Sequence, residues 1–173
     1  ITNAMTRFVA MLLMLIGSWQ FSHASNQLDS LQQLLNGAND SLRAELLLQM
    51  ASLAPANNAQ AALNYGNQAL GLAEKLHNQR LETEALYVVG LAHISLHNHK
   101  AALPALLLLR SQYETLGDVA RATACSYHLG TVYNALGQYE QANSAFQSAL
   151  ELALTNGLTS VQADVYQTRG TIA

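Results

Sequence analysis

The sequence predicts an all-α protein, a right-handed superhelical solenoid built from antiparallel helix pairs, and three observations support this fold class. Leucine and alanine, both strong helix formers, account for 32 and 28 of the 173 residues. Aromatic residues make up only 6% of the chain, and β-branched residues are too few for a sandwich or a barrel. Similar residues also return every 40 positions, which is typical of stacked helical repeats.

The composition also limits the classes of protein. Half of the chain is hydrophobic, which excludes a wholly disordered protein. Only 11% of the residues are charged, against roughly 25% in an average soluble domain, so 13 Asn and 14 Gln must supply much of the polar surface. The net charge is -3 and no block of Lys or Arg is present. We therefore expect no nucleic-acid partner, because binding the phosphate backbone requires a basic surface.

The first segment, residues 1–24, is interpreted as a secretory signal peptide. Arg7 precedes the apolar run Phe8–Ile16, and small residues occupy the two positions of 22–24 that a signal peptidase reads. The run is shorter than the roughly 20 residues that span a bilayer. The residues before Met5 are interpreted either as translated upstream sequence or as a leader remnant. These features predict export to the periplasm; the alternatives are an uncleaved anchor and an apolar first helix packed on the domain.

Residues 25–39 are expected to form an N-terminal capping helix that runs from Leu28 to Leu35 and ends at Asn36 and Gly37. The only cysteine of the chain, Cys125, excludes an internal disulfide bond. It is either a reactive thiol or a small buried helix residue. The second interpretation is favoured because no neighbouring group in the sequence would lower the thiol pKa.

The 40-residue period organises the rest of the chain, 40–173. Glycine recurs at positions 90, 130 and 170, and alanine recurs at 62, 102 and 142. Each unit is predicted to be a helix pair, with turns near 54–58, 97–98 and 137. Pro104 falls inside the second helix of its unit and predicts a kink unless it lies in the first turn. The predicted units are 42–76, 83–116, 123–156 and a truncated unit, 163–173.

The clearest unit consists of helices over 121–136 and 139–154, which Gly137 separates. Glycine and alanine are expected where the two backbones approach, and large apolar residues fill the space around them. The residues expected to pack within and between units are Gly90, Ala102, Leu129, Gly130, Tyr133, Gly137, Tyr139, Ala142, Phe146, Ala149 and Gly170.

The segment LGTVYNALGQYEQANSAFQSAL (129–150) resembles a tetratricopeptide repeat. It matches the pattern L-G-x-x-Y, a turn glycine followed by Tyr, and A-x-x-x-F-x-x-A. The first unit has Met50 at the glycine position and Gly66 at the phenylalanine position. The second unit has histidines where Tyr, Gly and Tyr are usual. The resemblance covers about 40–173 and implies a solenoid whose concave side is lined by the first helix of each unit.

The 40-residue period and the stretch ALNYGNQALGLAEKLHNQRLETEALYVVG resemble a subgroup whose repeats precede bacterial signalling domains. This resemblance implies the extracytoplasmic sensory region of a longer membrane-bound protein, of the diguanylate cyclase or histidine kinase type. The chain ends within a helix, without a capping repeat, so contact with a membrane is expected only through a missing C-terminal part. The alternative function is a freestanding exported adaptor that binds peptides or partner subunits.

The repeat register places the second, fifth, ninth and twelfth residues of each first helix on the concave side. These candidate groove residues are Glu84, Tyr87, Leu91, Ile94, Ala124, Tyr127, Thr131 and Asn134. An aromatic and amide lining suits a protein or peptide partner. Some family members grip a C-terminal carboxylate with Lys, Asn and Arg here, but this chain has no Lys or Arg at these positions. In the alternative interpretation, the two tyrosines only cover the edges of neighbouring helices.

No catalytic motif is present: the sequence lacks a nucleophile elbow, a phosphate-binding loop and the H-E-x-x-H zinc motif. We therefore expect neither an enzyme nor a cofactor. His93, His97 and His99 have ligand-like spacing, but each replaces a repeat-defining residue, so no metal site is expected. The apolar side of Val165, Tyr166 and Ile172 lacks a following helix, which predicts self-association or disorder at the C-terminal end.

Overall fold

The structure is a computed structural model that describes residues 27–54 and 58–170, and within these ranges it contains helices and no strand. A short helix covers 27–35. It is followed by α2 (Asp40–Leu53), α3 (Ala59–Lys75), α4 (Gln79–Ser95), α5 (His99–Leu116), α6 (Val119–Ala135), α7 (Tyr139–Thr155) and α8 (Thr159–Gly170). The all-α fold class is confirmed. None of the described helices is long and apolar enough to cross a bilayer. The predicted signal peptide lies outside the described residues.

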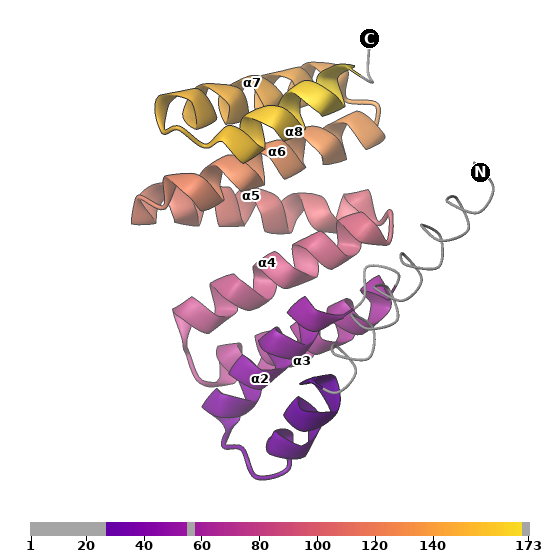
Figure 1. The fold of residues 1–173 in the computed structure, drawn as a ribbon, viewed down its shortest axis with the longest axis vertical. Coiled ribbons are helices and arrows are strands. Elements are labelled where there is room, and N and C mark those ends of the chain that lie inside the picture. Colours follow the sequence, from indigo (N-terminus) through magenta and orange to yellow (C-terminus); the bar gives the residue numbers. More distant parts are fainter. Residues whose placement is uncertain (1–26, 55–57, 171–173) are drawn as a thin grey trace, which may run out of the picture.

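Each helix packs against the next one in the sequence, so that antiparallel pairs stack in chain order from α2 to α8 (Figure 1). We call the first helix of each pair, α2, α4, α6 and α8, helix A, and the second, α3, α5 and α7, helix B. Helix A also contacts the following helix A between α2 and α4 and between α6 and α8. This stacking buries apolar stripes that no single pair could cover.

A left-handed residue ends one helix after another at a spacing of 20 residues. These residues are His77, His97, Gly117, Gly137 and Gly157, with φ between 51° and 74°. A helix cannot continue through this conformation, and the N–H of the next residue turns back and donates a hydrogen bond to a carbonyl oxygen of the preceding helix. The amide of Gln138, for example, donates to the carbonyl of Tyr133 at 2.9 Å. The 40-residue repeat therefore consists of two 20-residue halves.

The A helices begin earlier than the predicted repeat units. The side chain of Asn78 accepts a hydrogen bond from the amide of Leu81, and that of Asp118 accepts one from Arg121. These caps start α4 and α6 one turn before the expected unit starts at 83 and 123, because a short polar residue after the turn glycine or histidine satisfies the free amides. In α5, the exposed Pro104 is the sixth residue, and the helix continues without interruption to Leu116.

The packing residues predicted from the repeat lie largely in the core. Gly90 and Gly130 are buried, and Tyr133 is partly buried against two core clusters. The side chains that are at most 3% exposed are those of Ala102, Leu129, Ala142, Phe146 and Ala149. Gly137 and Tyr139 are the exceptions. Gly137 is exposed in the turn before α7, and Tyr139 is the first residue of α7, with a side chain that is 62% exposed. The expectation that Gly137 and Tyr139 pack between units is wrong. Gly170 is the last residue of α8.

Among the glycines for which the space around an added Cβ atom is described, Gly130 has the least room, because α6 and α7 approach closely there. A Cβ atom on Gly130 would lie 2.5 Å from Cε1 of Phe146. At the equivalent position of the previous pair, a Cβ on Gly90 would lie 3.8 Å from Ala105 and Leu106. The larger ring of Phe146 in place of Leu106 therefore requires glycine at 130, whereas the second pair has room for a methyl group.

More of the apolar surface of the C-terminal helix, α8, is buried than the sequence indicated. Val165 is fully buried and packs in a cluster with Phe146, Ala149 and Leu150. Of the other two residues named for this side, Tyr166 is 58% exposed, and Ile172 lies outside the described residues. The expectation that Val165 is uncovered is wrong, because α7 already supplies the surface against which this side of α8 packs.

Candidate functional site

The eight candidate groove residues lie on one side of α4 and of α6, and all are partly exposed. On each helix the four positions are separated by three or four residues, which places them on a single helix face. We call this set the A-helix face: Glu84, Tyr87, Leu91 and Ile94 on α4, with Ala124, Tyr127, Thr131 and Asn134 on α6.

The A-helix face is open in the second and third units but closed in the first. Three of the four equivalent positions, Ala44, Leu47 and Ala51 of α2, are at most 6% exposed, and the fourth, Ala54, follows the end of α2 and is partly exposed. The helix over 27–35 accounts for part of this burial, because Leu35 packs on the cluster that contains Leu47. The N-terminal helix thus covers the first unit, and the accessible side chains begin on α4.

A series of aromatic contacts joins the two halves of this face. Tyr87 meets Tyr113 of α5 edge to face, with ring centroids 6.5 Å apart, and lies at the same distance from His128 of α6. His128 in turn lies 5.4 Å from Tyr127. The backbones of α4 and α6 approach each other less closely than those of the neighbouring A-helix pairs, so these rings fill a wider space between two A helices.

Tyr127 also fixes the position of the last helix. Its ring lies 6.0 Å from that of Phe146, and its hydroxyl group is 3.1 Å from Oγ1 of Thr168 on α8. Both tyrosines are therefore used in packing between successive helices, as the alternative interpretation of the sequence held. A role of their exposed edges in binding stays a prediction.

Burial controls the protonation of the groups behind the face. Burial lowers the pKa of His128, although Asp164 on α8 acts in the opposite direction, so the imidazole is neutral at neutral pH. Burial raises the pKa of Tyr87, and the nearby Cys125 raises it further. Burial also raises the pKa of Cys125 to about 12. The thiol is fully buried, and of the two interpretations of Cys125, the structure favours the buried helix residue.

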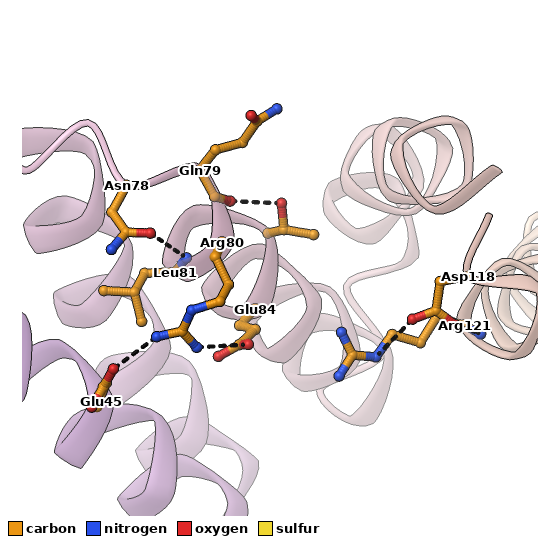
Figure 2. Close-up of polar contacts among 9 residues, drawn as sticks. Glu45, Asn78, Gln79, Arg80, Leu81, Glu84, Asp118 and Arg121 are labelled. Atoms are coloured by element: carbon orange, nitrogen blue, oxygen red, sulfur yellow. Dashed lines mark hydrogen bonds and ion pairs between the residues drawn. The ribbon is translucent and has the colours of Figure 1, made fainter. Parts of the chain in front are cut away.

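Glu84 is held by an ion pair and does not present a free carboxylate. Arg80 donates to Glu84 at 3.0 Å on the same helix and to Glu45 of α2 at 2.7 Å, and thus connects two A helices (Figure 2). The hydrogen bond from Arg80 to Glu45 is the main reason that the pKa of this guanidinium is raised. Because the groups are exposed, such pairs add little stability, but they do fix the charge at this edge of the face.

Ile94 belongs more to the core than to the face, because it packs against the core cluster that contains Ala102 and Leu106. Leu91, Thr131 and Asn134 lie outside the aromatic series. Thr131 donates its hydroxyl proton to the carbonyl of His128 at 2.7 Å. An apolar side chain and two small polar side chains therefore form the part of the A-helix face that is least committed to packing.

A surface cavity that the sequence did not indicate lies at the turn between α4 and α5. Its volume is about 370 Å³, and it is lined by His97, Asn98, His99, Lys100, Ala101 and Leu136. The rings of His97 and His99 are 5.8 Å apart, whereas His93 is not part of the lining. No three His, Cys, Asp or Glu side chains within 27–54 and 58–170 are grouped closely enough to hold a metal ion.

No protein-family model matches the sequence, and no curated protein matches it. Among solved structures, the fold is similar to that of a Rap protein complexed with competence and sporulation factor. The TM-score is 0.69 and the sequence identity is 20%; the match covers 90% of this chain and 48% of the Rap chain. The chain thus spans about half the length of that protein. At this identity the likeness shows the fold alone, a tetratricopeptide-like helical repeat.

Proposed function

We propose that the protein is a protein-binding helical repeat module and that the A-helix face holds an extended segment or a helix of its partner. The observation that carries this proposal is the change from a closed to an open face along the solenoid. The side chains at equivalent positions are buried on α2, where the N-terminal helix packs, and partly exposed on α4 and α6. Exposed apolar and amide groups at repeated positions suit a polypeptide ligand.

The chemistry of the face favours an uncharged contact. Leu91 and the exposed edges of the two tyrosine rings offer apolar surface, and Asn134 offers an amide that can pair with a backbone. Glu84 is already paired with Arg80. The similar Rap structure is a complex with competence and sporulation factor, which supports the idea that this fold can serve binding.

Site-specific photo-crosslinking tests this function. A photoreactive residue at position 91 or 134 should crosslink to the same partner, whereas the same residue at Gln147, on the exposed side of α7, should not. Leu91→Glu should abolish the capture of that partner, and Gln147→Glu, which adds the same charge elsewhere, should preserve it. Equal crosslinking at all three positions, or at 147 alone, would show that the A-helix face is not the binding surface.

We also propose that the module is the extracytoplasmic sensory region of a longer membrane-bound bacterial signalling protein, with a diguanylate cyclase or histidine kinase as its output domain. The alternative is a freestanding exported adaptor. The gene sequence downstream of the codon for Ala173 separates them, because only the first requires a transmembrane helix and an output domain.

Export itself can be tested with residues 1–24. Fused to a reporter enzyme that is active only after disulfide formation, this segment should give activity outside the cytoplasm, and the mature chain should begin at Ser25 by mass spectrometry. A fusion that stays in the cytoplasm would contradict export.

A further inference from the structure

The exposed side of α5 differs from the same side of the other two B helices. Three positions of α5 carry apolar side chains where the neighbouring repeats carry amides or serine. These positions are Pro104, Leu107 and Leu108 in α5, Asn64, Asn67 and Gln68 in α3, and Ser144, Gln147 and Ser148 in α7. Leu107 is 38% exposed and Leu108 is 50% exposed. Among these three B helices, only α5 therefore carries apolar side chains at these equivalent positions.

We infer that this side of α5 is an interface with a second copy of the chain, in which the two α5 helices pack antiparallel about a two-fold axis. We call it the α5 patch: Lys100, Pro104, Leu107, Leu108, Ser111 and Thr115. This surface is separate from the A-helix face, so the inference does not depend on the proposed function.

The arrangement of the patch suits a copy of itself. Its positions are symmetric about the point between Leu107 and Leu108, so an antiparallel copy places the leucine pair on the leucine pair. Lys100 lies near one end of α5 and Glu114 near the other. The antiparallel arrangement brings Lys100 close to Glu114 of the second copy and also places opposite ends of the two helix dipoles together.

Among the described residues of one copy of the chain, neither Lys100 nor Glu114 is held in a close ion pair that would compete with pairing between copies. Lys100 has no ion-pair partner within 27–54 and 58–170, and Glu114 has only a loose pair with Arg110 at 3.5 Å. Lys100 is the one charged member of the patch, so contact between two copies desolvates few charges. The α5 helix has 18 residues and is about 27 Å long. A contact along one such helix is smaller than a standard interface of roughly 1,600 Å², which predicts a weak dimer with a Kd in the micromolar range.

Sedimentation velocity of the 173-residue chain over a concentration series tests the inference. The chain should pass from monomer to dimer, and the variant L107Q/L108S, which introduces the residues of α7 at these positions, should weaken dimerisation at least about tenfold. Because α7 carries these residues at equivalent positions, the variant should keep the thermal midpoint of the wild type. Leu154→Gln, at a leucine of similar exposure on α7, is the matched control and should dimerise like the wild type.

Exchanging the charges at positions 100 and 114 tests whether a second copy covers the α5 patch and whether its α5 helix runs antiparallel. Lys100→Glu alone and Glu114→Lys alone should each weaken the dimer, and the double variant should restore it, because only an antiparallel copy brings these two positions together. A chain that stays monomeric at all concentrations, whether the patch is open or covered by residues 1–26, overturns the inference. A dimer that persists in L107Q/L108S, for example through α8, overturns it as well.

Discussion

Adding one methyl group at two equivalent glycines should change stability in opposite directions. Gly90 and Gly130 occupy the same place in successive A helices, each inside a helix and buried. Alanine in a helix interior is favoured over glycine by about 1 kcal/mol. At Gly90 the new Cβ would be 3.8 Å from its nearest neighbours, an ordinary contact. Gly90→Ala should therefore stabilise the protein by about 0.5–1 kcal/mol.

At Gly130 the same change forces two buried groups together. The Cβ would lie 2.5, 2.6 and 2.9 Å from three atoms of the Phe146 ring, which is itself fully buried and cannot swing outward. Overpacking of this kind costs about 1–3 kcal/mol and should exceed the gain in helix propensity. Gly130→Ala should then destabilise the protein by up to about 2 kcal/mol.

Thermal unfolding of both variants measures the difference. For a chain of this size, 1 kcal/mol corresponds to about 2–4 °C in Tm, so Gly90→Ala should raise Tm and Gly130→Ala should lower it. In a Phe146→Leu background, which lacks the ring atoms that clash, the cost of Gly130→Ala should fall by at least about 0.5 kcal/mol. If both alanine variants are stabilised equally, the helices α6 and α7 do not approach at Gly130 and the packing argument is refuted.

The remaining predictions concern the core, a turn and a half-buried histidine. Phe146→Ala should leave a cavity that costs about 3–5 kcal/mol, measured as a lower urea midpoint; an unchanged midpoint would show that Phe146 is not part of the core. His97→Gly should stabilise the protein by about 1 kcal/mol, because His97 has φ 58° and glycine adopts this conformation without strain; a lower Tm would contradict this. Burial depresses the pKa of His128 in the folded state, so as pH falls the imidazole binds a proton in the unfolded chain before it does so in the folded one. The contribution of neutral His128 to stability is therefore fully present above its ordinary pKa of 6.5. It is lost as pH falls from there to the lower pKa of the folded state. The free energy of unfolding should therefore fall less between pH 7.5 and pH 5.5 in His128→Gln than in the wild type, and an equal fall in both proteins would be the contrary result.

The sequence by itself determined the all-α fold, the helix pairs and most of the turns. This was possible because the 40-residue period repeats the same local requirements, such as Gly137 at a left-handed turn and Gly130 beside a large residue of the next helix. Each of these requirements is local or concerns adjacent helices, and the repeat supplies several copies of the same signal. The start of α4 at Gln79, one turn earlier than expected, depended on the cap at Asn78.

Only the tertiary structure decided which exposed positions are free. Tyr87 and Tyr127 have the same register in their repeats, but their contacts with Tyr113, His128 and Thr168 depend on how far apart α4, α6 and α8 lie. The burial of the first unit likewise depends on the packing of the helix over 27–35. A repeat pattern fixes the face on which a side chain lies, whereas its exposure depends on the neighbours that stacking places beside it, because burial is a property of the whole assembly of helices.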